Sequence, residues 1–362
     1  MAIQNLIISN LLGFKRINKV IHGNNKKANE GHSVFNDFEF KFEDGINIFI
    51  GENGIGKTSI LKMIYAATKC SFKKNNPGKD IRLIDFFSYG LNDSDLIGNR
   101  ELEDSSAFFY ISDGEHEFRY NILDKGVIEE KGWVGLNISA IYIPAGEMLS
   151  HSKGFLALNS KYKLPFDEAQ IDIIVNASLP ETREIHPCME TILSTISEAI
   201  DGEVIQENDD FYVLKKNGKK ILFSLEAEGF RKLGLLWKLI RNGLFENGSI
   251  LLWDEPESNL NPEMFSLIAE ILLALEENGV QIFIATHSYN LAKYFELRRK
   301  RKNQVVYHSL CRSNAIYDFA VSKGERNMSL DKSFYLKDIG NNSMMMADEA
   351  LLDEAFDKDL AD

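Results

Sequence analysis

The hydrophobic pattern divides the chain into buried strands and amphipathic helices. Residues 46–50 are almost continuously apolar, as in a strand buried on both faces, and apolar residues recur at helical spacing from 60 to 65. Two further buried-strand runs, at 250–253 and 280–285, flank a helical pattern at 265–275. Strands that alternate with helices in this way predict an α/β fold.

The pattern changes between these segments. Residues 108–123 predict a hairpin that turns at Asp113-Gly114, and 137–144 predict another strand. After Pro144 we expect a helical subdomain, then a second hairpin over 211–225 that turns at Asn217-Gly218. The polar stretches 73–79 and 154–165 are expected to be mobile loops, and no sustained heptad predicts a long coiled coil.

Composition narrows the class of protein without naming a function. With 44% hydrophobic and 26% charged residues, the 362-residue chain is globular. Three dispersed cysteines and the lack of a membrane-length apolar run predict a cytoplasmic protein with no membrane partner. His186 and Cys188 alone are too few ligands for zinc. A net charge of −13 means that any DNA or RNA partner would need a local basic patch.

A glycine-rich loop joins the first buried strand to its helix. Residues 51–58, Gly-Glu-Asn-Gly-Ile-Gly-Lys-Thr, fit the pattern G-x-x-x-x-G-K-[ST], whose glycines let backbone N–H groups surround phosphate oxygens at a helix N-terminus. Lys57 is expected to reach the β- and γ-phosphates, and Thr58 to bind Mg²⁺. We therefore expect ATP and Mg²⁺ as cofactors, with nucleotide contacts from Asn53, Gly54, Gly56, Lys57, Thr58 and Ser59.

Acidic residues follow the second buried strand. Asp254 comes at its carboxyl end, where ligands bind in parallel sheets, and is expected to hold Mg²⁺ through water. Glu255 points to the other side of the strand and is placed to deprotonate an attacking water. His287, after the third strand, is a candidate γ-phosphate sensor.

These three segments resemble the ABC-type ATPases, in particular the SMC, RecF and OLD-like branch of small bacterial ATPases in DNA repair and phage defence. The resemblance covers roughly the first 70 residues and 225–290. It implies an α/β P-loop fold of ABC-ATPase type, with an antiparallel β subdomain, an inserted helical subdomain and no long coiled coil. It also implies a Walker A motif at 51–58 and a Walker B motif at 251–255. A D-loop would follow at 258–261, and the switch histidine would be residue 287. Lys57, Glu255 and His287 would be catalytic.

The family hydrolyses ATP between two protomers, so the resemblance implies a homodimer or higher oligomer. Its signature loop matches best at 224–233, where Gly229 would approach phosphate from the second protomer. Glu228 replaces the usual serine, and a carboxylate there is unfavourable unless Arg231, Lys232 or Mg²⁺ compensates. The strength of this contact and the turnover rate stay open. Gln170 is available as a Q-loop residue.

The order of motifs predicts one nucleotide-binding fold split by an insertion. Residues 1–145 would form the Walker A lobe with the β subdomain, and residues 146–245 the helical insertion with the signature loop. Residues 246–310 would carry the Walker B motif and the switch histidine, and residues 311–362 an extension with an acidic tail. The basic run 298–302 is expected to be a solvated helix end, with a nucleic-acid or acidic-partner contact as the alternative. The tail at 348–362 could dock on a partner or fold back onto that run.

We expect an ATP-gated enzyme. Two subunits would sandwich two ATP·Mg²⁺ head to tail, and this state would control DNA sensing or a separate effector in phage defence or DNA repair. Two alternatives stay open. One is the ATPase subunit of a membrane transporter, which the about 170 residues between Lys57 and Gly229 disfavour. The other is a slow nucleotide-dependent scaffold in which Glu228 weakens catalysis. The residues after His287 lack the acidic cluster of a two-metal nuclease, so the effector is expected to be another protein.

Overall fold

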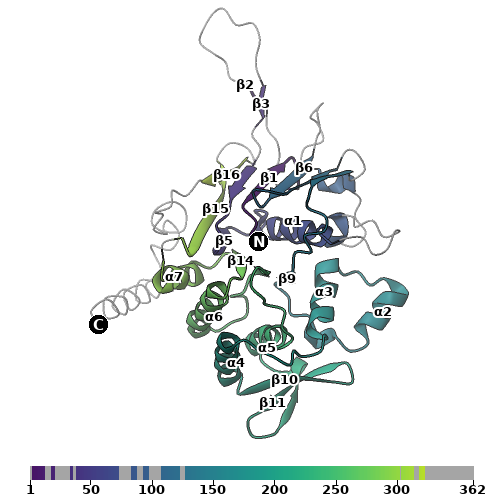
Figure 1. The fold of residues 1–362 in the computed structure, drawn as a ribbon, viewed down its shortest axis with the longest axis vertical. Coiled ribbons are helices and arrows are strands. Elements are labelled where there is room, and N and C mark those ends of the chain that lie inside the picture. Colours follow the sequence, from purple (N-terminus) through teal and green to yellow (C-terminus); the bar gives the residue numbers. More distant parts are fainter. Residues whose placement is uncertain are drawn as a thin grey trace, which may run out of the picture.

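A six-stranded sheet forms the centre of the molecule (Figure 1), a computed structural model that describes residues 2–12, 18–20, 33–35, 38–72, 83–87, 93–97, 107–122, 127–301, 303–313 and 318–322. Five neighbouring strands run parallel, and the edge strand β16 is antiparallel to β15. In sheet order the strands are β16 (Asp318–Ser322), β15 (Val305–Ser313), β5 (Ile46–Gly51), β14 (Gln281–Thr286), β13 (Ile250–Asp254) and β9 (Ala140–Ile143). The α/β prediction and the four strands expected within this sheet are confirmed.

A second, antiparallel sheet lies across helix α1 (Lys57–Cys70). The hairpin predicted around Asp113-Gly114 is confirmed, and Gly114 has the positive φ of +96° that such a turn favours. In sheet order the strands are β4 (Phe38–Lys41), β1 (Asn5–Ser9), β6 (Phe108–Ser112), β7 (Glu117–Asn121) and β8 (Val127–Lys131). A separate pair is formed by β2 (Asn18–Val20) and β3 (Ser33–Phe35).

Two hydrophobic cores cover the two faces of the central sheet, because successive strand residues point to opposite sides. Phe49 and Phe283 pack with α1 and the antiparallel sheet, whereas Ile48 and Ile282 pack with the helices on the other face. Those helices are α3 (Glu168–Ala177), α4 (Pro187–Ala199), α5 (Glu228–Arg241), α6 (Phe265–Glu277) and α7 (Tyr289–Arg298). The motifs predicted to bind nucleotide therefore follow fully buried strands.

The region after β9 is helical, as predicted, and ends in a three-stranded sheet of β10 (Gly202–Glu207), β11 (Asp210–Lys215) and β12 (Lys220–Leu222). The hairpin at Asn217-Gly218 is confirmed. The prediction of a mobile loop at 154–165 is wrong, because α2 (Phe155–Tyr162) forms there. Only its first residue is buried, and apolar residues such as Leu158 and Tyr162 are exposed, so the helix packs weakly and its pattern gives no buried face. The loop expected at 73–79 lies outside the described residues.

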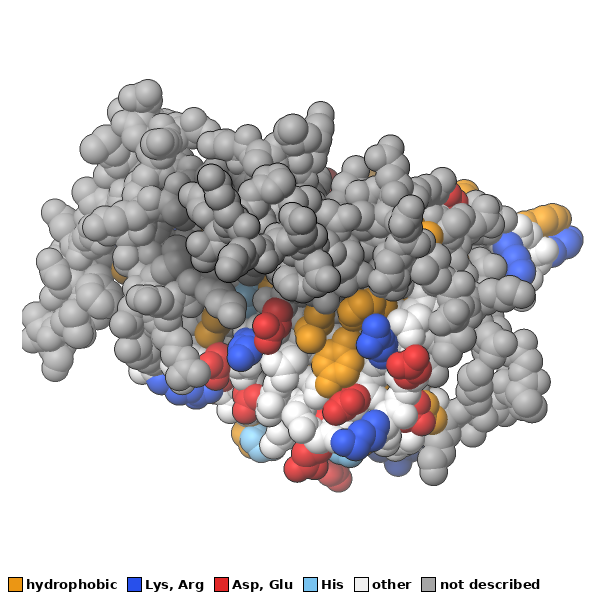
Figure 2. All heavy atoms as spheres, turned by 90° about the horizontal axis from the view of Figure 1, so that it is seen from above, with side chains coloured by type: hydrophobic (Ala, Val, Ile, Leu, Met, Phe, Trp, Pro, Cys, Tyr) orange, Lys and Arg blue, Asp and Glu red, His pale blue; other side chains and the backbone are white. Residues whose placement is uncertain are grey.

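Short 3₁₀ helices complete the description: η1 (Leu83–Phe86), η2 (Asp93–Leu96), η3 (Leu149–His151), η4 (Phe223–Leu225) and η5 (Pro262–Met264). None of the described helices is both long and apolar enough to cross a membrane. Seen from above, the end of the molecule that carries β1 and β6 shows hydrophobic side chains with charged groups of both signs around them (Figure 2). In the antiparallel sheet, the guanidinium of Arg119 lies 3.9 Å from the centre of the Phe108 ring.

Candidate nucleotide site

The glycine-rich loop curls around its own lysine. Gly54 and Gly56 adopt positive φ angles of +74° and +99°, so the backbone bends as the motif requires, and Gly56 precedes the first turn of α1. The buried ammonium of Lys57 donates to the carbonyl oxygens of Gly51 and Glu52, at 2.7 and 2.8 Å. Burial lowers the pKa of Lys57, and the charges of nearby carboxylates oppose that shift.

Thr58 and Asp254, 196 positions apart in the chain, meet at the carboxyl edge of the central sheet. The Thr58 hydroxyl lies 3.1 and 2.9 Å from the two carboxylate oxygens of Asp254. Burial raises the pKa of Asp254 to about 6, and the hydrogen bond from Thr58 opposes the rise. A hydroxyl beside a carboxylate is the hard oxygen donor set that Mg²⁺ prefers, so these residues fit the ion expected from the sequence.

Glu255 has an unusual backbone conformation for its residue type. Its φ is +46°, in the left-handed region that costs a residue with a side chain about 1–2 kcal/mol. Several hydrogen bonds hold it there. Its N–H donates to the carbonyl of Ala285 at 2.9 Å, and its own carbonyl accepts the Ser258 N–H at 3.1 Å and the Lys232 ammonium at 2.9 Å. Lys232 is buried in α5, so α5 helps to fix the backbone of Glu255.

His287 lies between two glutamates. Its Nδ1 atom is 3.4 Å from Oε1 of Glu255 and 3.5 Å from Oε1 of Glu257. Glu257 is nearly buried, and the same oxygen accepts the Thr286 hydroxyl at 2.6 Å and the His287 N–H at 3.1 Å. The motif contains Glu257, but sequence reasoning gave it no role, because nothing in the pattern shows where a side chain after Pro256 points.

Gly229 lies in the first turn of α5, against the segment predicted as the D-loop. A Cβ atom at Gly229 would come within 2.9 Å of the end of the Leu260 side chain and 3.4 Å of the Asn259 carbonyl oxygen, so a larger residue would require the Leu260 side chain to shift. Oε1 of Glu228 accepts a hydrogen bond of 2.8 Å from the Asn259 amide. The start of α5 is therefore bound to the segment predicted as the D-loop of the same chain.

The cations expected to compensate Glu228 have other partners. The guanidinium of Arg231 donates to Glu147 at 3.2 Å and to Ser150 at 2.6 Å, which ties α5 to the chain that follows β9. Lys232 contacts the carbonyl of Glu255. Burial lowers the pKa of Lys232, and the charges of Glu257 and then Glu228 oppose that shift.

Gln170, the available Q-loop residue, caps α3. Its side-chain oxygen accepts the Asp167 N–H at 3.2 Å, while Asp167 accepts the Gln170 N–H at 2.9 Å. This capping box presents Asp167 to Lys62 of α1, at 2.7 Å. A second link joins α1 to α3, because the Tyr65 hydroxyl donates to Asp172 at 2.7 Å. Gln170 thus supports a contact between the phosphate-loop helix and the inserted helices.

The basic run at 298–302 is paired within the chain. Its four described cations each lie against a glutamate: Arg298 with Glu270, Arg299 with Glu296, Lys300 with Glu277 and Arg301 with Glu276. These pairs favour the interpretation as a helix end over a nucleic-acid patch. The acidic tail lies outside the described residues. His186 and Cys188 touch each other, and the described part of the chain contains no group of three metal-ligating side chains.

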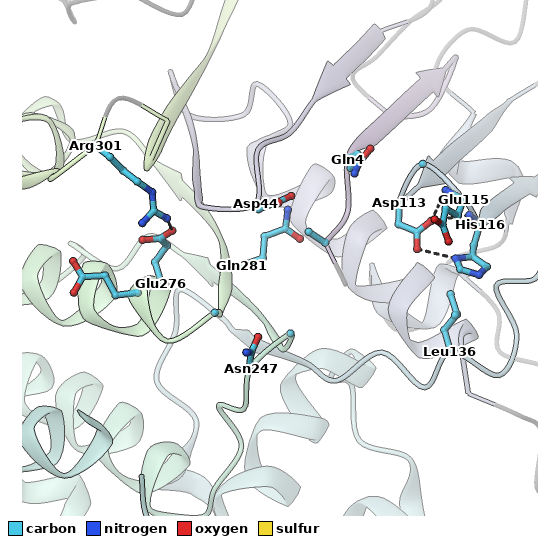
Figure 3. Close-up of a pocket in the computed structure, with 15 residues that line it drawn as sticks. Gln4, Asp44, Asp113, Glu115, His116, Leu136, Asn247, Glu276, Gln281 and Arg301 are labelled. Atoms are coloured by element: carbon cyan, nitrogen blue, oxygen red, sulfur yellow. Dashed lines mark hydrogen bonds and ion pairs between the residues drawn. The ribbon is translucent and has the colours of Figure 1, made fainter. Parts of the chain in front are cut away.

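A separate hollow of about 960 Å³ lies at the opposite edge of the sheet, where β14 begins (Figure 3). Figure 3 shows Gln281 between the Arg301–Glu276 pair on one side and the Asp113–His116 pair on the other. The residues that line this hollow include more carboxylates than cations, and their negative charge opposes the binding of a polyphosphate. The candidate nucleotide site is therefore the carboxyl edge, where Lys57, Thr58 and Asp254 lie.

Comparisons with known proteins agree with this geometry. The family model described as "AAA domain, putative AbiEii toxin, Type IV TA system" matches residues 197–293, and the one described as "AAA domain" matches residues 30–138. The DNA replication and repair protein RecF from two strains of Clostridium botulinum is 30% identical over 97 residues, 26% of each chain. The L-cystine import ATP-binding protein TcyN of Bacillus subtilis is 22% identical over 156 residues, 38% of this chain and 58% of TcyN. The chain thus spans about a quarter of the matched RecF proteins and little more than half of TcyN.

Solved structures show the same fold. An SMC head bound to the C-terminal winged-helix domain of ScpA has a TM-score of 0.52 at 12% identity, covering 89% of this chain and 97% of that one. An SMC head from Pyrococcus furiosus, with an extended coiled coil and bound to the C-terminal domain of ScpA, has a TM-score of 0.51 at 11% identity and covers 96% and 99%. With the phosphate loop and the acidic strand end together at one edge of the sheet, these matches support a P-loop ATPase of the ABC, SMC and RecF-like type.

Proposed function

We propose that this chain binds ATP with Mg²⁺, hydrolyses the γ-phosphate, and closes head to tail with a second copy when ATP is bound. The observation that carries the proposal is the convergence of Lys57, Thr58, Asp254, Glu255 and His287 at the carboxyl ends of three adjacent parallel strands. Each of these groups has a separate task in phosphoryl transfer, which depends mainly on positioning and charge stabilisation.

The proposed division of labour follows from the contacts. Backbone N–H groups of the loop at 53–59 would bind the phosphates, and Lys57 would leave its carbonyl partners to neutralise the β- and γ-phosphates. Thr58 and Asp254 would hold Mg²⁺, which supplies charge neutralisation when bound. Glu255 would accept the proton of the attacking water, with His287 beside it to contact the γ-phosphate.

Exposure at the site supports a second subunit. The side chains of Glu255 and His287 are 30% and 43% exposed, although the strands that carry them are fully buried. Leu225, just before α5, is 76% exposed, which is unusual for a large apolar side chain. A partner copy that presented its α5 N-terminus would cover both features. We propose that this closed state gates DNA sensing or a separate effector protein in phage defence or DNA repair.

Glu255→Gln is the direct test, because it keeps the shape of the side chain and removes the proton acceptor. We expect turnover to fall at least about 100-fold with ATP affinity preserved, since general-base contributions are on the order of 10²–10⁴. Light scattering should then show an ATP-dependent dimer that persists. Glu198→Gln, on an exposed face of α4, is the matched control. Unchanged turnover in Glu255→Gln would contradict the assignment of the base.

Lys57→Ala tests nucleotide binding itself. We expect loss of ATP binding, because no other cation is held inside the phosphate loop among the described residues. Lys216→Ala, an exposed position in a hairpin turn, controls for the loss of one positive charge. ATP binding that survives Lys57→Ala would contradict the proposed site.

A transporter ATPase is the second candidate, and the similarity to TcyN favours it. It predicts that the chain copurifies with a membrane permease, whereas the first proposal predicts a soluble partner. A slow scaffold is the third, favoured by the Glu228 carboxylate at the start of α5. A steady-state ATPase assay with and without DNA separates it from the first, because a scaffold would show negligible turnover in both.

A further inference from the structure

Glu257 is a nearly buried carboxylate at the site, and the roles proposed above do not use it. Its side chain is 5% exposed, and it follows the proposed base by two residues. One oxygen, Oε1, accepts hydrogen bonds from the Thr286 hydroxyl and from the backbone N–H of His287. The other, Oε2, has no hydrogen-bond partner within the described structure. Burying a carboxylate oxygen without a partner is unfavourable, so stability alone does not account for this residue.

The bonds of Glu257 fix the three residues that surround the histidine. The Thr286 hydroxyl, which donates to Glu257, also accepts the Ser288 N–H at 2.9 Å. The Ser288 hydroxyl in turn caps α7 by accepting the Leu291 N–H at 3.2 Å. The end of β14 and the start of α7 are therefore joined through one carboxylate oxygen, and His287 stands between them.

The geometry around His287 makes this anchoring relevant to the proposed reaction. Nδ1 lies 3.4 Å from Glu255, a distance that depends on the backbone at 286–288 as well as on the ring. Glu255 has a left-handed backbone held by Lys232, so both members of the contact are fixed by neighbouring side chains. Misplacement by about 1 Å in such a contact can cost on the order of 100-fold in rate.

We propose that Glu257 is a positioning residue for His287: its carboxylate holds the end of β14 so that the imidazole stays against Glu255. Glu257 itself then neither accepts the proton of water nor binds the metal. This inference rests on the proposed ATPase function of the site. It differs from a merely structural role, because it predicts a loss of turnover without a matching loss of ATP binding.

Two substitutions separate the functions of the carboxylate. Glu257→Ala removes the acceptor of Thr286 and of the His287 N–H, whereas Glu257→Gln keeps an oxygen acceptor and removes the charge. We expect Glu257→Ala to lower kcat at least about 20-fold, with KM for ATP within about threefold of the wild type. Glu257→Gln should restore kcat to within about fivefold of the wild type, because the two hydrogen bonds can form again.

A double-mutant cycle tests the coupling to His287. If Glu257 acts through the histidine, Glu257→Ala combined with His287→Ala should be no slower than His287→Ala alone, since residues that act as a unit are non-additive. Losses that multiply in the double variant would overturn the proposal. So would a Glu257→Gln variant as slow as Glu255→Gln, because that result would give the charge of Glu257 a direct part in the chemistry.

A spectroscopic readout keeps the inference separate from the proposed activity. In protein with isotope-labelled histidine, His287→Gln identifies the His287 ring signals among the seven histidines. We expect Glu257→Ala to move or broaden these signals and Glu257→Gln to leave them near their original positions. Unmoved signals in Glu257→Ala would overturn the positioning role even if ATP is hydrolysed. If the wild type fails to hydrolyse ATP but the signals move as expected, the proposed function fails and the anchoring stands.

Thr286→Val provides a second route if Glu257→Ala does not fold. It removes one of the two donors to Glu257 and leaves the carboxylate and His287 in place. We expect a smaller fall in kcat, about three- to tenfold, with the same shift of the His287 signals and unchanged KM. A folded Thr286→Val variant with wild-type kcat and unshifted signals would contradict the proposal.

Discussion

The left-handed backbone of Glu255 predicts an unusual order of stability for two substitutions at that position. At most sites alanine is more stable than glycine, because glycine loses more conformational freedom on folding. At Glu255, φ is +46°, a conformation that glycine adopts without strain and alanine does not. We therefore expect Glu255→Gly to be more stable than Glu255→Ala.

The magnitude follows from two opposing terms. A left-handed residue with a Cβ costs about 1–2 kcal/mol, and glycine pays about 0.4–1 kcal/mol more unfolded-state entropy. The difference favours glycine by about 0.5–1 kcal/mol. The hydrogen bonds from Lys232 and Ser258 reach the backbone carbonyl of residue 255, so they are present in both variants and cancel. Both variants lack the proposed base and should be equally slow.

Urea unfolding followed by tryptophan fluorescence measures the difference, since Trp253 is fully buried two residues before the substitution. The matched control is the pair Glu198→Gly and Glu198→Ala in α4. There we expect the usual order, with alanine more stable by about 1 kcal/mol. If alanine were also the more stable residue at 255, the reasoning from backbone strain would be refuted.

Two further predictions concern the scaffold of the site. Burial lowers the pKa of His308 to about 4, below the 6.5 of an unfolded histidine, so only the unfolded state gains a proton as the pH falls below 6.5. His308 should therefore contribute a loss of about 2 kcal/mol of stability between pH 7.5 and pH 5, measured as the difference between the wild type and His308→Gln in pH-matched urea titrations. Equal acid sensitivity in the two proteins would contradict it. Gly51→Ala places a Cβ 2.4 Å from the Leu310 carbonyl oxygen, so we expect a lower unfolding midpoint and weaker ATP binding. Gly146→Ala meets nothing within 4 Å and should match the wild type in both measurements.

The parts of the fold that follow from local pattern could be predicted from the sequence. The phosphate loop combines a buried strand, fixed glycine positions and a helix within twenty residues, so Lys57 and Thr58 could be located directly. Asp254 could be placed because the carboxyl ends of parallel strands share one edge. The hairpin turns at Asp113-Gly114 and Asn217-Gly218 carry their own conformational signal.

The remainder depends on contacts between distant residues. Glutamate gives no indication of a positive φ, so the strain at Glu255 appears only when β13, β14 and α5 are assembled. Helix α2 contains several apolar residues, but it is short and only Phe155 is buried, so the hydrophobic pattern does not mark a helix face there. The role of Gln170 was readable in part, because Asp167 precedes it by three positions, the spacing of a capping box.

The departure of Glu228 from the usual signature has a physical consequence within the single chain. Its carboxylate binds Asn259, and Gly229 beside it packs against Leu260 of the same predicted D-loop. One helical turn later, Lys232 extends this contact to the carbonyl of Glu255. Because the left-handed backbone of Glu255 is held by that bond, a displacement of the start of α5 reaches the proposed base through three short contacts. In the proposed dimer, a change in the position of α5 would then affect the rate of ATP hydrolysis more directly than the replacement of the usual signature serine by Glu228.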